Sequence, residues 1–184
     1  AIQPDGKIVF SYLTTSPSPL TGFGIVRLNS DGSLDGSFTN NFPSSRFEAL
    51  AILPSGQILA AGPFGFSYVS SGGGSEPHNG IVRINSDGSH DRTFRSALTT
   101  DGANFTAAYA MDVQPDGKII VYNAPAMSVN GELRSGMFRL NPDGTTDTTF
   151  SYNNEGGVGI NNVMVAPDGK IVIAGTASPN HAKM

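Results

Sequence analysis

The chain has 184 residues, a formal net charge of −4 at pH 7 and no cysteine. Without cysteine it has neither a disulfide framework nor a thiolate metal site. Its lysines and arginines are dispersed, which argues against a nucleic-acid partner and against membrane insertion of this segment.

The chain opens with a short apolar run, a Pro-Asp-Gly turn and a second apolar run, written AIQPDGKIV at 1–9. Pro4 presets φ at the first turn position, and Gly6 supplies the positive φ that closes a bulged turn. β-Branched and aliphatic residues flank the turn, as paired strands require. Close copies of this first hairpin occur at 51–59, 113–121 and 163–172.

A second hairpin follows the first, written IVRLNSDGSLDGSF at 25–38, and it recurs at 81–94 and 137–150. Counting back from a bulge at Gly32 places Arg27 directly opposite Asp35, close enough for a cross-strand ion pair. The copies lie 56 residues apart. The same count predicts the structural ion pairs Arg27–Asp35, Arg83–Asp91 and Arg139–Asp147.

Two hairpins in each repeat give four strands, and no window shows a helical period. A repeat of this length with four short antiparallel strands is typical of a β-propeller blade, whereas a solenoid is the weaker alternative. We therefore expect an all-β fold, a single β-propeller segment over 1–184 with about three and a half four-stranded blades. The repeats are expected near 1–38, 48–94, 109–150 and 160–177.

A ring of this kind needs more blades than the chain supplies, since propellers close with four to eight. We expect the chain to be a piece of a longer polypeptide. Its partners would then include further blades of the same parent chain, packed against its two outer sheet faces.

The repeated pattern resembles the delta-sixty repeat, in which P-D-G-K-I is followed by R-x-N-x-D-G-(S/T)-x-D-x-(S/T)-F. The resemblance covers nearly the whole chain and implies a propeller-type repeat in a large bacterial protein. Many proteins with such repeats are secreted or surface-exposed, so the resemblance implies an extracellular or cell-surface location. It supplies no catalytic motif.

Most acidic residues occupy repeat positions, and nine of the eleven aspartates do so. A residue repeated in every blade is more plausibly scaffold than catalytic. The NSDGSLD stretch resembles a calcium loop, but Arg27 stands where the first carboxylate ligand belongs. An Asx turn is the better interpretation, and we expect no catalytic residue, no metal and no cofactor.

Asp112 is the one charge that interrupts an apolar first strand, where the equivalent positions hold Ala1, Ala51 and Met164. The innermost strand of a blade lines the central channel. Asp112 is therefore a candidate for binding a cation or a polar ligand, and the alternative is a hydrogen-bonded or solvated carboxylate.

Length varies only in the connections between hairpins and between blades, which an up-and-down blade places on one face. Loops on a rigid scaffold concentrate recognition. Two of these connections carry aromatic clusters, GPFGFSY at 62–68 and NFTAAY at 104–109. The candidate binding residues are Phe64, Phe66, Tyr68, Phe105, Tyr109 and Asp112, although the aromatic side chains are equally suited to capping the core.

The sequence thus favours a noncatalytic binding or scaffold propeller that contacts protein or carbohydrate through its variable-loop face. The alternative is part of a propeller enzyme whose channel-lining active site is completed by other blades. A spacer without a ligand is a third possibility, because a strict 56-residue register is what a spacer would show.

Overall fold

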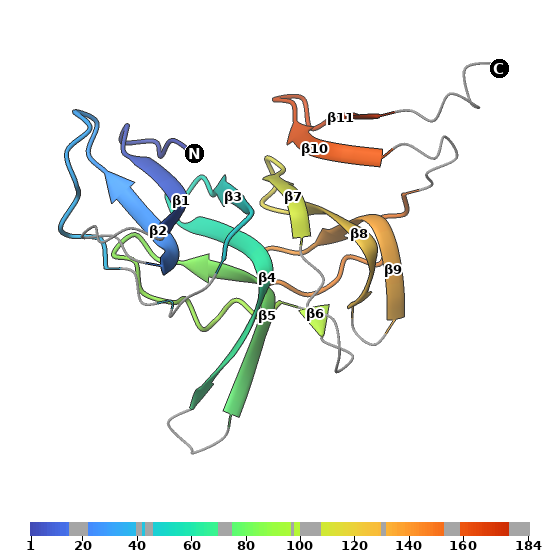
Figure 1. Cartoon of the computed structure of the whole chain (residues 1–184). Coiled ribbons are helices and arrows are strands. Elements are labelled where there is room, and N and C mark those ends of the chain that lie inside the picture. Colours follow the sequence, from blue (N-terminus) through green and yellow to red (C-terminus); the bar gives the residue numbers. More distant parts are fainter. Residues whose placement is uncertain are drawn as a thin grey trace.

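The computed structural model describes residues 1–14, 22–39, 42, 46–69, 75–96, 98–99, 108–129, 132–152 and 159–176. Within these residues the chain forms antiparallel sheets and no helix (Figure 1). No described segment is a helix with the length and hydrophobicity needed to span a bilayer. The all-β fold expected from the repeats is therefore confirmed.

Each sheet corresponds to one repeat, so the sheets are named here as the first to fourth blades. The strands of the first and second blades are β1 (Ile8–Thr14), β2 (Gly22–Leu28), β3 (Ala49–Ile52), β4 (Ile58–Val69) and β5 (Ser75–Ile84). Those of the third and fourth are β6 (Leu98–Thr99), β7 (Ala108–Val113), β8 (Ile119–Val129), β9 (Glu132–Leu140), β10 (Gly159–Val165) and β11 (Ile171–Thr176).

The first-hairpin turns have the bulged geometry that their sequence predicts. In the first blade, the backbone N–H of Gly6 donates to Gln3 O at 2.9 Å, and that of Gln3 donates to Lys7 O at 2.8 Å. Gly6 has φ of 82°. The same two bonds recur at the other three copies of the turn.

The fourth strand expected in each of the first three blades is reduced to a single bridge pair. These pairs are Leu28–Leu34, Ile84–His90 and Leu140–Thr146. One residue beyond each bridge, an aspartate side chain caps the backbone N–H two residues on, as Asp35 does for Ser37 at 3.0 Å. This Asx turn bends the chain out of the sheet, so the following Phe reaches the space between blades.

In the second and third blades, strand pairing continues further into the connection between the two hairpins than the sequence predicts. β4 pairs with β5 from Ile58–Ile84 out to Val69–Ser75, with a register shift between Ala61 and Gly65. β8 and β9 form a similar extension. In Figure 1 the paired strands β4 and β5 extend away from the Pro-x-Gly turns.

The blades stack through three apolar clusters, one at each blade interface. In β4, Ile58 and Ala60 pack toward the first blade, whereas Leu59 and Ala61 pack toward the third. All four are fully buried. Because successive side chains of a strand point to opposite faces, a strand buried on both faces reads as an unbroken apolar run.

The inner strands β3, β7 and β10 lie side by side, as expected around a propeller axis. The outer faces of the two terminal blades carry exposed apolar side chains, including Phe10 on the first blade and Met164 and Val172 on the fourth. The structure is therefore a partial propeller with two open sheet faces.

Candidate functional site

The three repeated arginines lie opposite the aspartates that the hairpin count assigns to them. The Arg Nε donates to Asp Oδ2 in each blade, at 2.7 Å for Arg27–Asp35 and 2.8 Å for Arg83–Asp91 and Arg139–Asp147. Arg27 and Asp35 are both buried. A Lys or Gln from the first hairpin also donates to the same Oδ2, as Lys7 does to Asp35 at 2.9 Å.

The other carboxylate oxygen serves the Asx turn. Asp91 Oδ1 accepts from the backbone N–H of Thr93 at 2.9 Å and from its hydroxyl at 2.6 Å. Burial raises the pKa of the Asp91 carboxyl, but the hydrogen bonds from Thr93 and then Arg83 outweigh burial and lower the pKa to about 2. The Ser37 hydroxyl, followed by Lys7, holds the pKa of Asp35 well below its ordinary value.

Each arginine also reaches beyond its own hairpin. Arg27 Nη1 donates to Ser86 O of the second blade at 2.6 Å, and Arg83 Nη1 donates to Pro142 O of the third at 2.7 Å. The Arg27 guanidinium lies 4.8 Å from the ring centroid of Phe38. These contacts join neighbouring blades, so the repeated charges are engaged inside the scaffold.

Asp112 links two inner strands. Its Oδ1 accepts from the backbone N–H of Val113 at 2.8 Å, and its Oδ2 accepts from that of Val165 in the fourth blade at 2.7 Å. Both carboxylate oxygens thus accept backbone hydrogen bonds, the second of them across the interface between the third and fourth blades. Of the two roles considered for this residue, the geometry favours the hydrogen-bonded one.

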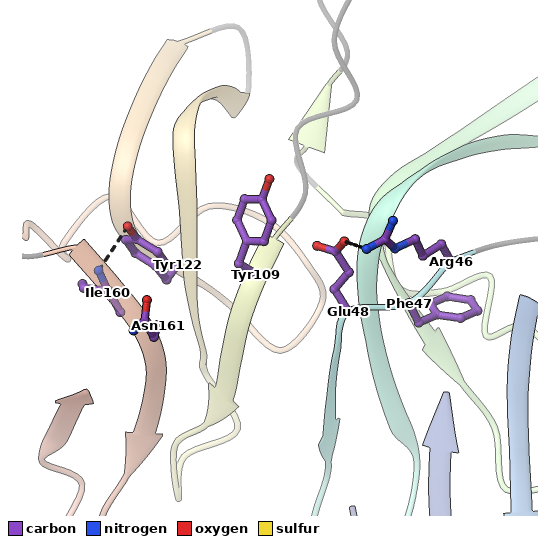
Figure 2. A pocket seen from close by; sticks show the side chains of 7 residues that line it. All are labelled: Arg46, Phe47, Glu48, Tyr109, Tyr122, Ile160 and Asn161. Carbon is purple, nitrogen blue, oxygen red and sulfur yellow. Dashed lines mark hydrogen bonds and ion pairs between the residues drawn. The ribbon is translucent and has the colours of Figure 1, made fainter. Parts of the chain in front are cut away.

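An open pocket of about 570 Å³ lies at the opposite end of the inner strands from the Pro-x-Gly turns (Figure 2). Glu48, Tyr109 and Asn161 each stand six residues before the turn proline of their blade. They therefore occupy the same position of the repeat in three successive blades. The residues lining this loop-face pocket are Arg46, Phe47, Glu48, Tyr109, Tyr122, Ile160 and Asn161.

The Glu48 side of the pocket is held by local backbone contacts. The backbone N–H of Glu48 donates to Ala61 O at 2.7 Å. Gly62 lets this segment approach β4, since a Cβ at that position would collide with the carbonyl oxygen of Arg46. Phe47 is buried beneath, with its ring centroid 5.1 Å from that of Phe64.

The polar groups of the pocket are partly paired. Arg46 Nη2 lies 3.1 Å from Glu48 Oε1. Glu48 Oε2 is buried and has no hydrogen-bond partner among the described residues. On the other wall, the Tyr122 hydroxyl accepts from the backbone N–H of Ile160 at 3.4 Å. Figure 2 shows Tyr109 between these two walls.

The aromatic residues that the sequence suggested for binding lie in different environments. Tyr109 is 46 % exposed and lines the pocket, whereas Phe64 is buried in the core between the first two blades. Phe66 and Tyr68 belong to β4, but their side chains lie outside the described part of the structure, as does Phe105 altogether.

Sequence reasoning missed Arg46, Glu48, Tyr122 and Asn161. The signal for Glu48 and Asn161 was present in the alignment of the inner strands, where the position of Tyr109 holds a different polar residue in each blade. Within the described residues, no three His, Cys, Asp or Glu side chains gather as a metal site requires.

A family model described as a β-propeller domain of unknown function (DUF5122) matches residues 3–38, 53–94, 114–150 and 166–182. The comparisons with curated proteins and with solved structures gave no match. The matched segments contain the turns and the Arg–Asp pairs, whereas Glu48, Tyr109 and Asn161 fall between them. Because the model covers well over half of the chain, the chain belongs to this family of β-propeller domains of unknown function.

Proposed function

We propose that the chain is a noncatalytic binding segment of a large bacterial secreted or cell-surface protein of the delta-sixty repeat type. It contacts protein or glycan through the face that carries its variable connections. One observation carries the proposal: a single position of the repeat brings Glu48, Tyr109 and Asn161 from three blades to one pocket, with a different side chain from each blade.

The contrast between the two faces supports this assignment. On the turn face, equivalent positions hold the same residues, and these residues bond to one another and to the next blade. At the pocket, equivalent positions differ, the buried Glu48 Oε2 lacks a hydrogen-bond partner among the described residues, and Tyr109 is 46 % exposed. Variation on a repeated scaffold is what recognition of one specific partner requires.

The binding role has more support than the channel enzyme. Asp112, the residue that an enzyme would draw from this segment, accepts hydrogen bonds from the backbone of Val113 and Val165. A spacer role accounts for the regular 56-residue spacing of the repeats. It does not account for a pocket whose lining differs from blade to blade.

The test is a binding screen of the intact chain against glycans and extracellular proteins by biolayer interferometry. The triple variant Glu48→Gln, Tyr109→Ala, Asn161→Ala should lose binding. The control is Thr148→Ala on the turn face, where the side chain is exposed, and it should bind normally. Binding that survives the triple variant, or a ligand recovered chemically altered, would contradict the proposal.

A further inference from the structure

We infer that the loop-face pocket takes an uncharged sugar unit of a glycan. This inference rests on the proposed function and names the ligand of the same site. Three properties of the lining carry it: its charge balance, an unsatisfied carboxylate oxygen, and an exposed aromatic ring beside polar groups.

The described lining has no net charge. Arg46 and Glu48 are its two ionised side chains, and they pair at 3.1 Å. An anionic ligand that used Arg46 would meet the Glu48 carboxylate, and a cationic ligand that used Glu48 would meet Arg46. A neutral ligand leaves the ion pair intact, so the charge balance favours an uncharged partner.

Glu48 Oε2 lacks a hydrogen-bond donor among the described residues. The side chain is 19 % exposed, and this oxygen is buried without a partner among the described residues. A buried ionised acceptor without a donor is costly, and a ligand hydroxyl group that donates to it removes that cost. On the far wall, the exposed Asn161 amide offers both a donor and an acceptor to further hydroxyls.

Tyr109 supplies the apolar surface that a sugar ring also needs. Its ring is 46 % exposed and stands between the Glu48 wall and the Asn161 wall (Figure 2). A pyranose presents C–H groups on its faces and hydroxyls around its edge, so a ring stacked on Tyr109 directs hydroxyls to both walls. The volume of about 570 Å³ falls in the ordinary range for small-ligand pockets.

The experiment exposes the intact chain to an array of neutral, sialylated and sulfated glycans and to Lys-rich peptides. Titration of the best neutral sugar as its methyl glycoside follows, by saturation-transfer NMR, at low and high salt. We expect a neutral glycan to bind with an affinity that changes less than about twofold with salt, since no net charge is neutralised.

The matched variants are Glu48→Gln and Asn161→Ala in the pocket and Asn162→Ala beside it. Asn162 is the next residue of β10, is also exposed, and lines a groove on the outer face of the fourth blade. We expect each pocket variant to weaken sugar binding about tenfold or more, and the control to stay within about twofold. Melting temperatures show whether each variant is folded.

Different results would contradict the proposed binding site and the inference that its ligand is an uncharged sugar. Binding only to charged glycans or to Lys-rich peptides, lost in the pocket variants, would overturn the sugar inference and keep the proposed binding site. No glycan binding by the folded chain would likewise overturn the sugar inference. Ligand binding that is unchanged in both pocket variants would overturn the site itself.

Discussion

The repeated arginine makes contacts both within its own hairpin and with the neighbouring blade. Arg83 donates to Asp91 within its hairpin, to Pro142 O of the next blade, and lies 5.1 Å from the centre of the Phe94 ring. Phe94 is fully buried in the cluster between the second and third blades. One side chain therefore fixes the turn, the blade interface and the position of the aromatic ring.

Replacing Arg83 by Met should lower the free energy of unfolding by about 2 kcal/mol, since the site is only partly shielded from water. Asp91→Asn should cost less, because the amide oxygen still accepts from Thr93. The double variant should cost less than the sum of the single variants, and urea unfolding measures this coupling. Additive losses would show that the two side chains do not act as a pair.

Acid should destabilise the fold between about pH 4 and pH 2. The unfolded Asp91 carboxyl titrates near its ordinary value of 3.8, and the folded pKa is lower, about 2. Stability from this group is therefore present above the unfolded pKa and is lost as the pH falls through the folded pKa. Asp35 and Asp147, whose pKa values are also lowered, add to the effect.

Thr93→Val should raise the folded pKa of Asp91, since the Thr93 hydroxyl is the largest of the groups that lower it. The part of the acid transition that belongs to Asp91 should then become smaller and move to higher pH. NMR titration of the Asp91 carboxyl measures the pKa directly. An unchanged pKa in the folded variant would assign the shift to Arg83 instead.

Counting along the hairpin was enough to predict the Arg–Asp register, because a bulged turn fixes which residues face each other. The contacts of Arg27 with Ser86 and of Arg83 with Pro142 were not predictable in this way, since they depend on how closely blades stack. The pocket was missed for the same reason: Glu48 and Asn161 meet only when three blades are placed side by side.

At the scale of elements, the second-hairpin turn is a docking point for the preceding blade. The backbone N–H of Thr39 donates to Asp87 O at 2.9 Å, and that of Arg95 donates to Asp143 O at 2.9 Å. Gly88 lies against Thr39, whereas Gly32 has open space around the position of a Cβ. The same turn glycine therefore has a conformational role in all three blades and a packing role in two, since Gly144 lies against Arg95 as Gly88 does against Thr39.

Gly32→Ala and Gly88→Ala form a matched pair, since both glycines have positive φ, 85° and 90°. Gly32→Ala should cost about 1 kcal/mol from backbone strain alone. Gly88→Ala should cost about 2 kcal/mol more, because its Cβ meets the carbonyl of Thr39. Denaturant unfolding compares the two, and equal losses would contradict the close packing of this turn.

The hairpins themselves were predictable, because Pro-x-Gly and Asn-x-Asp-Gly turns and apolar flanks specify them locally. The reduced fourth strand was not, since Leu34, His90 and Thr146 make one bridge each before an Asx turn redirects the chain. The long β4–β5 extension was also unexpected, because its sequence from Gly62 to Gly80 is rich in glycine and reads as loop.

At the scale of the whole molecule, stacking leaves one apolar sheet face open at each end. On the fourth blade, Met164 and Val172 occupy the positions that in β7 and β8 hold Asp112 and Ile120. Ile120 is fully buried against the fourth blade, whereas Met164 is 57 % and Val172 47 % exposed. The open face has the composition of an interface that another blade covers.

Residues 1–184 should self-associate through these faces when produced alone. Met164→Lys combined with Val172→Lys should shift sedimentation toward monomer, because charge opposes burial of the face. Thr148→Lys on the turn face adds one charge without touching the open face and should leave association unchanged. A wild-type chain that sediments as a stable monomer would contradict this view of the terminal blades.

The central claim is that side chains repeated in every blade hold the propeller together, whereas side chains that differ at equal positions bind the ligand. The most direct measurement is the melting temperature of Arg83→Met and Tyr109→Ala with and without a saturating neutral glycan. Arg83→Met should melt lower than wild type and keep the upward shift on adding glycan, whereas Tyr109→Ala should melt normally and lose the shift. The reverse pattern, with Arg83→Met losing the shift and Tyr109→Ala losing stability, would contradict the account.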